Sequence, residues 1–390
     1  LGKFAIFSTP ARSGYIDTKG KVVIENRFSQ FRSFSNGLAA VAQWSDAVKD
    51  VQWGFIDKKG KVVIATKYWG VSDFSNGLAR VVTEPMKPEN AEHLKLCLTM
   101  MHSRLRSPGI WNRVPDNGWC VSHGDWHKLT AGYFRPYGFI DRTGRVIMPA
   151  KLAKARDFSE GLAFARGKEY GFIDRSGQWV IESMRKQSIG DFHEGLARFL
   201  DHSKRGLEGF IDKKGNVAIP AQFNKLGDFS DGRAAFKSKD GNYGFIDTTG
   251  AVAIKAVHEK AFPFSDGLAA VLQDSRWGYI NRTGRVVIPL KYERTMGFSC
   301  GLAAVRVSGK WGYIDKKGKT VIAPRFPGAS VFMNDRARIN IGGEYHSSRL
   351  HRFGRDPRHD KHYWILNGAW RYIDKSGKFI QSCPDLLNIN

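Results

Sequence analysis

A short run of residues with metal-ligand side chains stands out at Cys120, His123, Asp125 and His127. A thiolate, two imidazoles and a carboxylate are ligand types that zinc prefers. Their spacing matches no established metal-site pattern, so the alternative is a polar loop whose side chains hydrogen-bond to the backbone. Zinc binding here is therefore a hypothesis, and we expect no other cofactor.

This run lies in the first of two stretches, residues 82–136 and 340–369, that together carry eight of the 11 histidines. Aromatic rings in the first stretch could stack on a sugar, base or peptide, or could form a small satellite core under a long loop. Arginines between the histidines of the second stretch suit phosphate or carboxylate groups, or a solvated basic loop. The candidate binding residues are Trp111, Trp119, Trp126, His123, His127, Arg349, Arg352, Arg355, His359 and His362.

The rest of the chain is an internal repeat, and both stretches interrupt it. An aromatic or small residue, Gly, Tyr or Phe, Ile, Asp, two polar residues and Gly precede a Val/Ile-rich run nine times. The acidic position is Asp17, Asp57, Asp141, Asp174, Asp212, Asp247, Asn281, Asp315 and Asp374, with successive gaps of 40, 84, 33, 38, 35, 34, 34 and 59 residues. A unit of about 34 residues with two insertions follows.

Each copy of this motif predicts a β-hairpin. Asp suits the first position of a type I turn, and the Gly three residues later supplies the left-handed conformation of a bulged loop. A second signature, seen at residues 34–41 and again at 298–305, precedes the hairpin and enters another strand. We therefore expect three antiparallel strands in each module.

The run from Trp277 to Pro289, with its successor at Trp311, resembles the bacterial WG repeat, also called the KWG repeat. The resemblance covers about three quarters of the chain. It implies β-rich repeats that occur in many bacterial proteins, usually without an assigned activity, and it supplies no catalytic residues. Glu208 in place of the leading Trp and Arg371 in place of the following Gly depart from the motif.

The predicted fold is all-β: about nine three-stranded antiparallel modules stacked as an open, solenoid-like array, because one module alone buries too little surface. The alternative is a closed, β-propeller-like ring. The expected parts are repeats 1 and 2 at 1–81, an insertion at 82–136, repeats 3 to 8 and the start of repeat 9 at 137–339, an insertion at 340–369, and the last hairpin and tail at 370–390.

The first insertion is expected to begin with an amphipathic helix over residues 90–106. Leu94, Leu98, Met101 and Leu105 follow helical spacing, and Asn90 is a suitable N-cap. Its apolar stripe would pack on the sheet, or alternatively on a partner or a membrane. Since both insertions fall between the first predicted strand and the hairpin of their modules, we expect them to emerge from the same side of the array.

Basic residues concentrate at the hairpin turns of a chain with 61 Lys+Arg against 37 Asp+Glu and a net charge of +24. Such an edge would attract a polyanion, either nucleic acid or an acidic glycan. The alternative is that these cations keep sheet edges soluble and unpaired. The candidate basic edge comprises Lys58, Lys59, Lys61, Lys316, Lys317 and Lys319.

The repeat predicts a binding scaffold and no enzyme, because its Asp residues lie at solvated turns and no phosphate loop, nucleophile elbow or zinc-protease helix is present. We expect protein–protein interaction, as in an accessory subunit of a larger bacterial assembly, with polyanion or metal binding as alternatives. No apolar stretch is long enough to span a membrane. Residue 1 is not Met, which slightly favours a secreted or periplasmic protein over a cytoplasmic one. The partner, oligomeric state and disulfide bonding are not predicted.

Overall fold

The computed structural model describes residues 5–8, 13–16, 22–25, 27–84, 136–167, 170–182, 188–349, 361–366 and 369–380. Within these ranges the chain is all-β, as predicted, with one short 3-10 helix, η1 (His202–Lys204). The strands form nine small antiparallel sheets and one separate two-stranded hairpin, and none of these sheets closes on itself. Each of the nine sheets is one predicted module, numbered 1 to 9 along the chain.

The chain divides into two compact units. Unit 2 is Arg27–Ser183 and contains modules 2 to 4, whereas unit 1 joins Leu1–Asn26 to Met184–Asn390 and contains modules 1 and 5 to 9. Both boundaries fall between modules, whereas the predicted boundaries followed the insertions. The choice between an open array and a closed ring depends on how the units are placed, and it stays a prediction.

The modules of unit 2 each have four strands. Module 2 contains β4 (Gln30–Phe31), β5 (Ala39–Ser45), β6 (Asp50–Ile56) and β7 (Val62–Tyr68); module 3 contains β8 (Gly70–Val71), β9 (Leu78–Val82), β10 (Tyr137–Asp141) and β11 (Val146–Leu152); module 4 contains β12 (Lys154–Ala155), β13 (Leu162–Arg166), β14 (Tyr170–Asp174) and β15 (Trp179–Ile181).

Unit 1 contains the remaining strands. They are β1 (Ala5–Ser8), β2 (Ser13–Ile16) and β3 (Val22–Ile24) in module 1; β16 (Ser188–His193), β17 (Leu196–Asp201), β18 (Leu207–Asp212) and β19 (Val217–Phe223) in module 5; β20 (Ala234–Lys237), β21 (Tyr243–Ile246) and β22 (Val252–His258) in module 6; β23 (Lys260–Ala261), β24 (Leu268–Gln273), β25 (Arg276–Asn281) and β26 (Val286–Tyr292) in module 7; β27 (Arg294–Thr295), β28 (Leu302–Val307), β29 (Lys310–Asp315) and β30 (Thr320–Phe326) in module 8; and β31 (Gly328–Ala329), β32 (Arg336–Ile341) and β35 (Ala369–Asp374) in module 9. The separate hairpin is β33 (Glu344–Arg349) with β34 (Lys361–Leu366).

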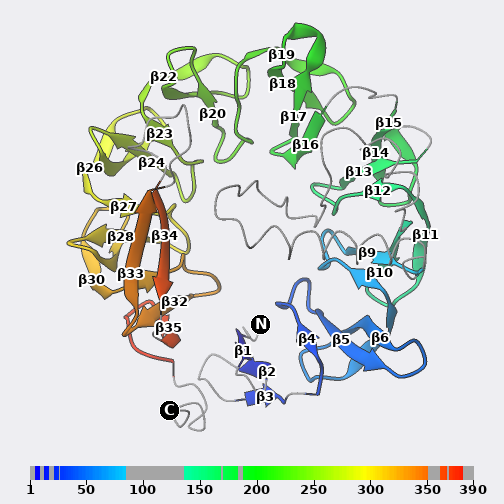
Figure 1. The fold of residues 1–390 in the computed structure, drawn as a ribbon. Helices are drawn as coiled ribbons and strands as arrows, with labels where there is room; N and C mark the ends of the chain where they lie inside the picture. The colour runs from blue at the N-terminus through cyan, green and yellow to red at the C-terminus, as the bar shows by residue number, and fades with distance from the viewer. Residues whose placement is uncertain are drawn as a thin grey trace, which may run out of the picture. The chain divides into compact units, whose positions relative to one another are not determined.

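Within a four-stranded module the strands pair in chain order as an antiparallel meander (Figure 1). The three predicted strands are the second, third and fourth of this meander. In seven modules a further strand of two to six residues precedes these three and forms the first strand of the sheet. The sequence analysis did not predict this strand. In module 9 the fourth strand is reduced to one bridge between Ile373 and Phe379.

The predicted Asp–Gly bends that lie within the described residues are tight reversals between the third and fourth strands. In module 8 the Asp315 carboxylate accepts hydrogen bonds from the backbone N–H groups of Lys317 and Lys319, both at 2.9 Å. Gly318 adopts φ +80°, and its N–H donates to the Asp315 carbonyl at 2.9 Å. This part of the fold prediction is confirmed.

The glycine that follows the leading aromatic residue is required because the fourth strand passes directly over it. A Cβ on Gly278 would lie 2.6 Å from the carbonyl oxygen of Ile288 and 2.8 Å from the nitrogen of Leu290. The pairing of β25 with β26 shifts register at the same place, so two extra residues of β26 are accommodated there. In module 9, where only one bridge represents the fourth strand, Arg371 occupies the equivalent position.

Neighbouring modules are joined by the turn between their first and second strands. The hydroxyl of Ser265 in module 7 donates to the Phe298 carbonyl of module 8 at 2.6 Å, and Ser299 donates to the Phe332 carbonyl of module 9 at 2.6 Å. A carboxylate adds a second tie, since Asp266 accepts from the Gly301 N–H at 2.8 Å. These contacts repeat about 34 residues apart and hold adjacent sheets in register.

The core is shared between adjacent modules. Tyr279 and Leu268 of module 7 pack in one buried cluster with Val305 and Ile314 of module 8. The motif aromatic is at most 1% exposed at Phe55, Phe139, Phe172, Phe210, Phe245, Tyr279 and Tyr313. Within each unit the sheets therefore cover one another's apolar faces, as repeat modules must.

Candidate functional site

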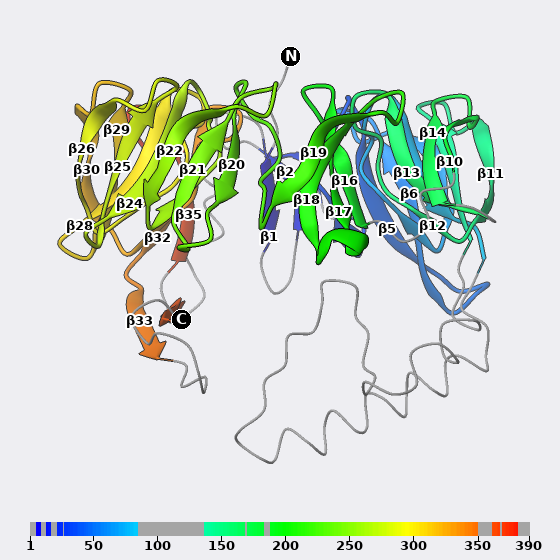
Figure 2. The same cartoon turned by 90° about the horizontal axis from the view of Figure 1, so that it is seen from above.

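The two insertions occupy the same place in their modules, as predicted. The first leaves and re-enters module 3 between its second and third strands, next to the pair formed by Val82 and Tyr137. The second does the same in module 9, next to the pair formed by Ile341 and Ala369. It continues from that end into the hairpin of β33 and β34, which projects away from β32 and β35 (Figure 2).

Most of the predicted insertion residues lie outside the described residues. In the first insertion these are the expected helix at 90–106 together with Trp111, Trp119, Cys120, His123, Asp125, Trp126 and His127. In the second they are Arg352, Arg355 and His359. Of the other two predicted residues, Arg349 is the last residue of β33, and His362 of β34 pairs with Ser348 of β33. Zinc binding at 120–127 stays a prediction, and so does recognition through the aromatic rings.

A meander separates the turns of a module into two ends. The turns between strands one and two and between strands three and four lie at one end, called the turn end. The connection between strands two and three lies at the other, called the insertion end. The predicted basic residues belong to the turn end, whereas both insertions leave from the insertion end of their modules.

The insertion end of module 2 carries a protrusion that the sequence analysis missed. Strands β5 and β6 continue beyond the length of other modules through the pairs of Trp44 with Val51 and of Ser45 with Asp50. Trp44 is 53% exposed and Val48 in the following turn is 39% exposed. The signal was the 40-residue gap between Asp17 and Asp57, which is longer than the usual 34.

The acidic turn residues are occupied by local hydrogen bonds. The Asp141 carboxylate accepts from the Thr143 hydroxyl at 2.6 Å and from the backbone N–H groups of Thr143 and Arg145. The Thr143 hydroxyl is the main cause that lowers the pKa of Asp141 to about 2. The pKa values of Asp174 and Asp247 are lowered by the same type of hydroxyl contact. Such carboxylates are poor general acids and bases near neutral pH.

We expect the Asp141 carboxyl to titrate with a midpoint near 2 and Thr143→Val to raise that midpoint toward the ordinary value. Because the folded-state pKa lies below the unfolded one, these hydrogen bonds stabilise the fold above pH 4 and are lost as the pH falls toward 2. Carboxyl NMR titration measures the midpoint. Asn281 holds the same turn without a titrating group, and an unchanged Asp141 midpoint in Thr143→Val would contradict the assignment.

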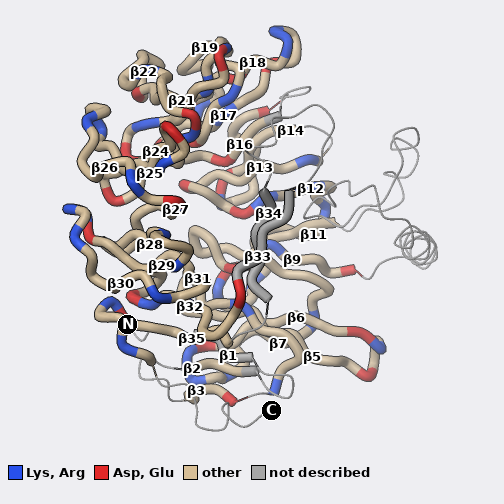
Figure 3. Tube along the Cα trace, turned by 60° about the vertical axis from the view of Figure 1, so that its left-hand side comes forward, with Lys and Arg blue, Asp and Glu red and all other residues tan. Residues whose placement is uncertain are grey.

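The basic edge is present but uneven. Lys58 is half-buried, and the other five predicted lysines are exposed at the turn end; among the described residues none of the six forms an ion pair. Other basic turn residues are neutralised, since Arg282 lies 3.4 Å from Asp231 and Lys375 lies 2.7 Å from Asp335. Lys and Arg near β26 and β30 are blue in Figure 3. Free positive charge therefore concentrates at a subset of the turns.

An open hollow of about 550 Å³ lies between modules 6 and 7, lined by Asp231, Asp266, Gly267, Asn281, Arg282 and Thr283. Both carboxylates are already engaged there. Asp231 accepts from the Gly267 N–H at 2.7 Å and faces Arg282, while Asp266 is tied to Gly301. The hollow is thus part of the contact between modules.

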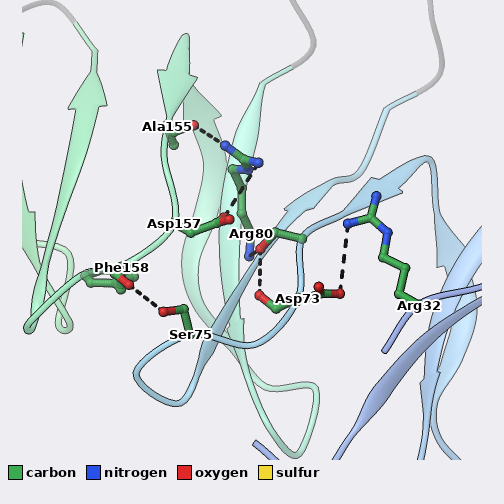
Figure 4. Close-up of polar contacts among 8 residues, drawn as sticks. Arg32, Asp73, Ser75, Arg80, Ala155, Asp157 and Phe158 are labelled. Atoms are coloured by element: carbon green, nitrogen blue, oxygen red, sulfur yellow. Dashed lines mark hydrogen bonds and ion pairs between the residues drawn. The ribbon is translucent and has the colours of Figure 1, made fainter. Parts of the chain in front are cut away.

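Charged ties also join the modules of unit 2 (Figure 4). Arg32 of module 2 lies 4.0 Å from Asp73 of module 3, and Arg80 of module 3 lies 3.6 Å from Asp157 of module 4. Burial raises the pKa of Asp73, and Arg32 opposes that shift. The sequence analysis missed these pairs, although the two aspartates stand at the same place in their modules, directly before Phe74 and Phe158. Their position between sheets indicates a structural role.

Among the described residues, no helix has the length and apolar character that a membrane span requires. In the same part of the chain, no group of three or more His, Cys, Asp and Glu residues is placed to hold a metal ion.

The matches to a known protein family coincide with the repeats of this chain. The family model described as WG containing repeat matches residues 14–43, 53–84, 137–166, 170–204, 209–243, 243–277, 277–311 and 311–345, together more than half of the chain. No curated protein matches the chain.

Among solved structures, "Crystal structure of the eukaryotic initiation factor" is similar over 97% of this chain and 95% of that one, with 10% identity and a TM-score of 0.55. BamB from Moraxella catarrhalis is similar over 79% of this chain and 89% of that one, with 13% identity and a TM-score of 0.35. At 10% identity the first of these similarities concerns the fold alone, and its fold is propeller-like.

Proposed function

The chain belongs to the family of WG-containing repeats, and from this premise we propose that it is a non-catalytic scaffold that binds a protein partner through the insertion ends of its modules. The partner would be another subunit of a larger bacterial assembly. The observation that carries the proposal is the shared position of both insertions, which interrupt an otherwise regular repeat between the second and third strands. Function commonly lies in loops that a rigid scaffold holds in place.

Two further observations support a scaffold. The described turn carboxylates, such as those of Asp141 and Asp315, accept hydrogen bonds within their own turns, and carboxylates held in this way are not poised acids or bases. The exposed Trp44 and Val48 project from the insertion end of module 2, in the same unit as the first insertion. An exposed Trp beside aliphatic surface is a typical anchor of a protein interface.

The test replaces residues 83–136 with Val-Ser-Gly-Lys, the connection that joins β28 to β29 in module 8. The graft is matched because Val82 pairs with Tyr137 as Arg306 pairs with Trp311. A partner is first captured from the native source by the full chain and identified, then purified and titrated against both proteins. We expect the graft to weaken binding by at least about 100-fold, equivalent to roughly 2.7 kcal/mol.

The matched control is Lys317→Gln with Lys319→Gln, which changes the turn end and leaves the insertion end intact. We expect this variant to bind the purified partner as the full chain does. Equal binding by the full chain and the graft would contradict the proposed role of the first insertion. Loss of binding with added salt and with the lysine substitutions, but not with the graft, would favour the polyanion alternative.

A further inference from the structure

Exposed aliphatic residues recur at the start of the fourth strand. In β7, β19, β26 and β30 the first two residues are exposed and the third is buried. Val286 is 44% exposed, Val287 is 40% exposed and Val321 is 42% exposed. Single exposed apolar residues need no explanation, but the second position of this strand is an exposed valine in two successive modules, at Val287 and Val321.

The packing of the modules places a lysine-bearing turn against the fourth strand of the preceding module, which carries the exposed valines. The turn of module 8 lies on the fourth strand of module 7, since a Cβ on Gly318 would be 3.3 Å from the side chain of Ile288. Lys317 and Lys319 flank Gly318, and Val287 precedes Ile288. The contact repeats one module further along, where a Cβ on Gly377 would be 3.2 Å from Ile322, the residue after Val321.

The lysines at this place carry free charge. Lys316, Lys317 and Lys319 are exposed, and in the described part of the chain they have no ion-pair partner. The nearby Asp315 carboxylate is occupied by the backbone N–H groups of Lys317 and Lys319. The turn that carries these three lysines therefore lies against the strand that carries Val286 and Val287, and the two features together define a patch of mixed character.

We propose that this patch, formed by Val286, Val287, Lys316, Lys317, Lys319 and Val321, docks the protein on an anionic lipid bilayer. The ammonium groups face the headgroup phosphates, and the valine side chains enter the boundary between headgroups and acyl chains. A nucleic acid would use the charges but would gain nothing from the valines, because its backbone and base edges are polar. The aliphatic strip thus favours a lipid surface. This inference goes beyond the scaffold function, which uses the opposite end of the modules.

The test is co-sedimentation of the full chain with vesicles of phosphatidylcholine alone and of phosphatidylcholine with one third phosphatidylglycerol. We expect binding to the anionic vesicles only. Each lysine near such a surface contributes about 1 kcal/mol, or about fivefold in partitioning, so Lys317→Gln with Lys319→Gln should weaken binding on the order of 30-fold. Val286→Ser with Val287→Ser should weaken it about tenfold, since two half-exposed side chains lose their apolar contact.

The matched control is Lys255→Gln with Lys291→Gln, which removes two exposed charges from the fourth strands of modules 6 and 7 away from the turn. We expect this variant to bind as the full chain does. A single-stranded DNA oligonucleotide provides the second readout. If the valine variant binds anionic vesicles as well as the full chain, and the lysine variant loses vesicles and DNA alike, the patch is a general polyanion site and the proposal is overturned. Absence of binding to anionic vesicles also overturns it.

Discussion

Substitution of Gly278 by Ala should lower the free energy of unfolding of unit 1 by about 3 to 5 kcal/mol. The added methyl group would lie 2.6 Å from the Ile288 carbonyl oxygen and 2.8 Å from the Leu290 nitrogen. Both atoms belong to the backbone of β26, so relief requires the whole fourth strand to move. Urea denaturation followed by tryptophan fluorescence, with Trp277 adjacent to the substituted site, measures the loss.

The chain contains its own control for this prediction. Arg371 stands at the equivalent position of module 9, where the fourth strand is reduced to the bridge between Ile373 and Phe379. Its guanidinium donates to the Trp370 carbonyl at 3.3 Å. We expect Arg371→Ala to change the free energy of unfolding by no more than about 0.5 kcal/mol. Similar losses from both substitutions would show that the passage of the fourth strand is not the cause.

The hairpins could be predicted from the sequence because their causes are local. Asp315 and Gly318 determine the turn within four residues, through hydrogen bonds and a left-handed backbone conformation that any reader of the motif can infer. The reason for Gly278 could not be inferred in the same way. It depends on the register shift between β25 and β26, and so on how the fourth strand crosses the third.

The first strand of each module escaped prediction because it is too short to carry a pattern. Strand β27 has two residues, Arg294 and Thr295, and its pairing with Arg306 and Val305 is evident only once β28 is in place. The pairs of Arg32 with Asp73 and of Arg80 with Asp157 were not predicted for a related reason, since each joins two residues more than 40 positions apart in the sequence.

The candidate site was predicted in part. The lysines of the turn end lie where the motif placed them, and both insertions leave from the predicted position. Val286 and Val287 were interpreted only as strand residues, because their exposure depends on how the modules pack and not on the motif alone. The extension of β5 and β6 was visible in the sequence only as a longer gap.

The separation of turn end from insertion end has a functional consequence. A ligand at Lys316, Lys317 and Lys319 would contact the turn end of module 8, whereas a partner at the insertions would contact the insertion ends of modules 3 and 9. Substitutions at one end should therefore add to substitutions at the other, since groups that share no contacts rarely couple. The graft at residues 83–136 and the substitutions at Lys317 and Lys319 can be combined to test this independence.

Phe264 tests whether the shared core or the turn contacts provide most of the stability. Its side chain is fully buried and packs on Phe245 of the preceding module with ring centroids 4.8 Å apart. We expect Phe264→Ala to lower the free energy of unfolding by about 3 to 5 kcal/mol, because the cavity lies between two sheets that cannot collapse independently. Urea denaturation of the full chain measures the loss.

Phe262, two residues earlier, provides the matched comparison. It is 41% exposed and stacks on Trp277 at 5.0 Å with a 9° interplanar angle, so Phe262→Ala should cost no more than about 1.5 kcal/mol. Equal losses in the free energy of unfolding from Phe264→Ala and Phe262→Ala would contradict this prediction. In that case the packing of Phe264 on Phe245 would not be what holds modules 6 and 7 together. A larger loss for Phe264→Ala instead means that stability arises at the contacts between modules, which is why a regular array tolerates insertions within a module so readily.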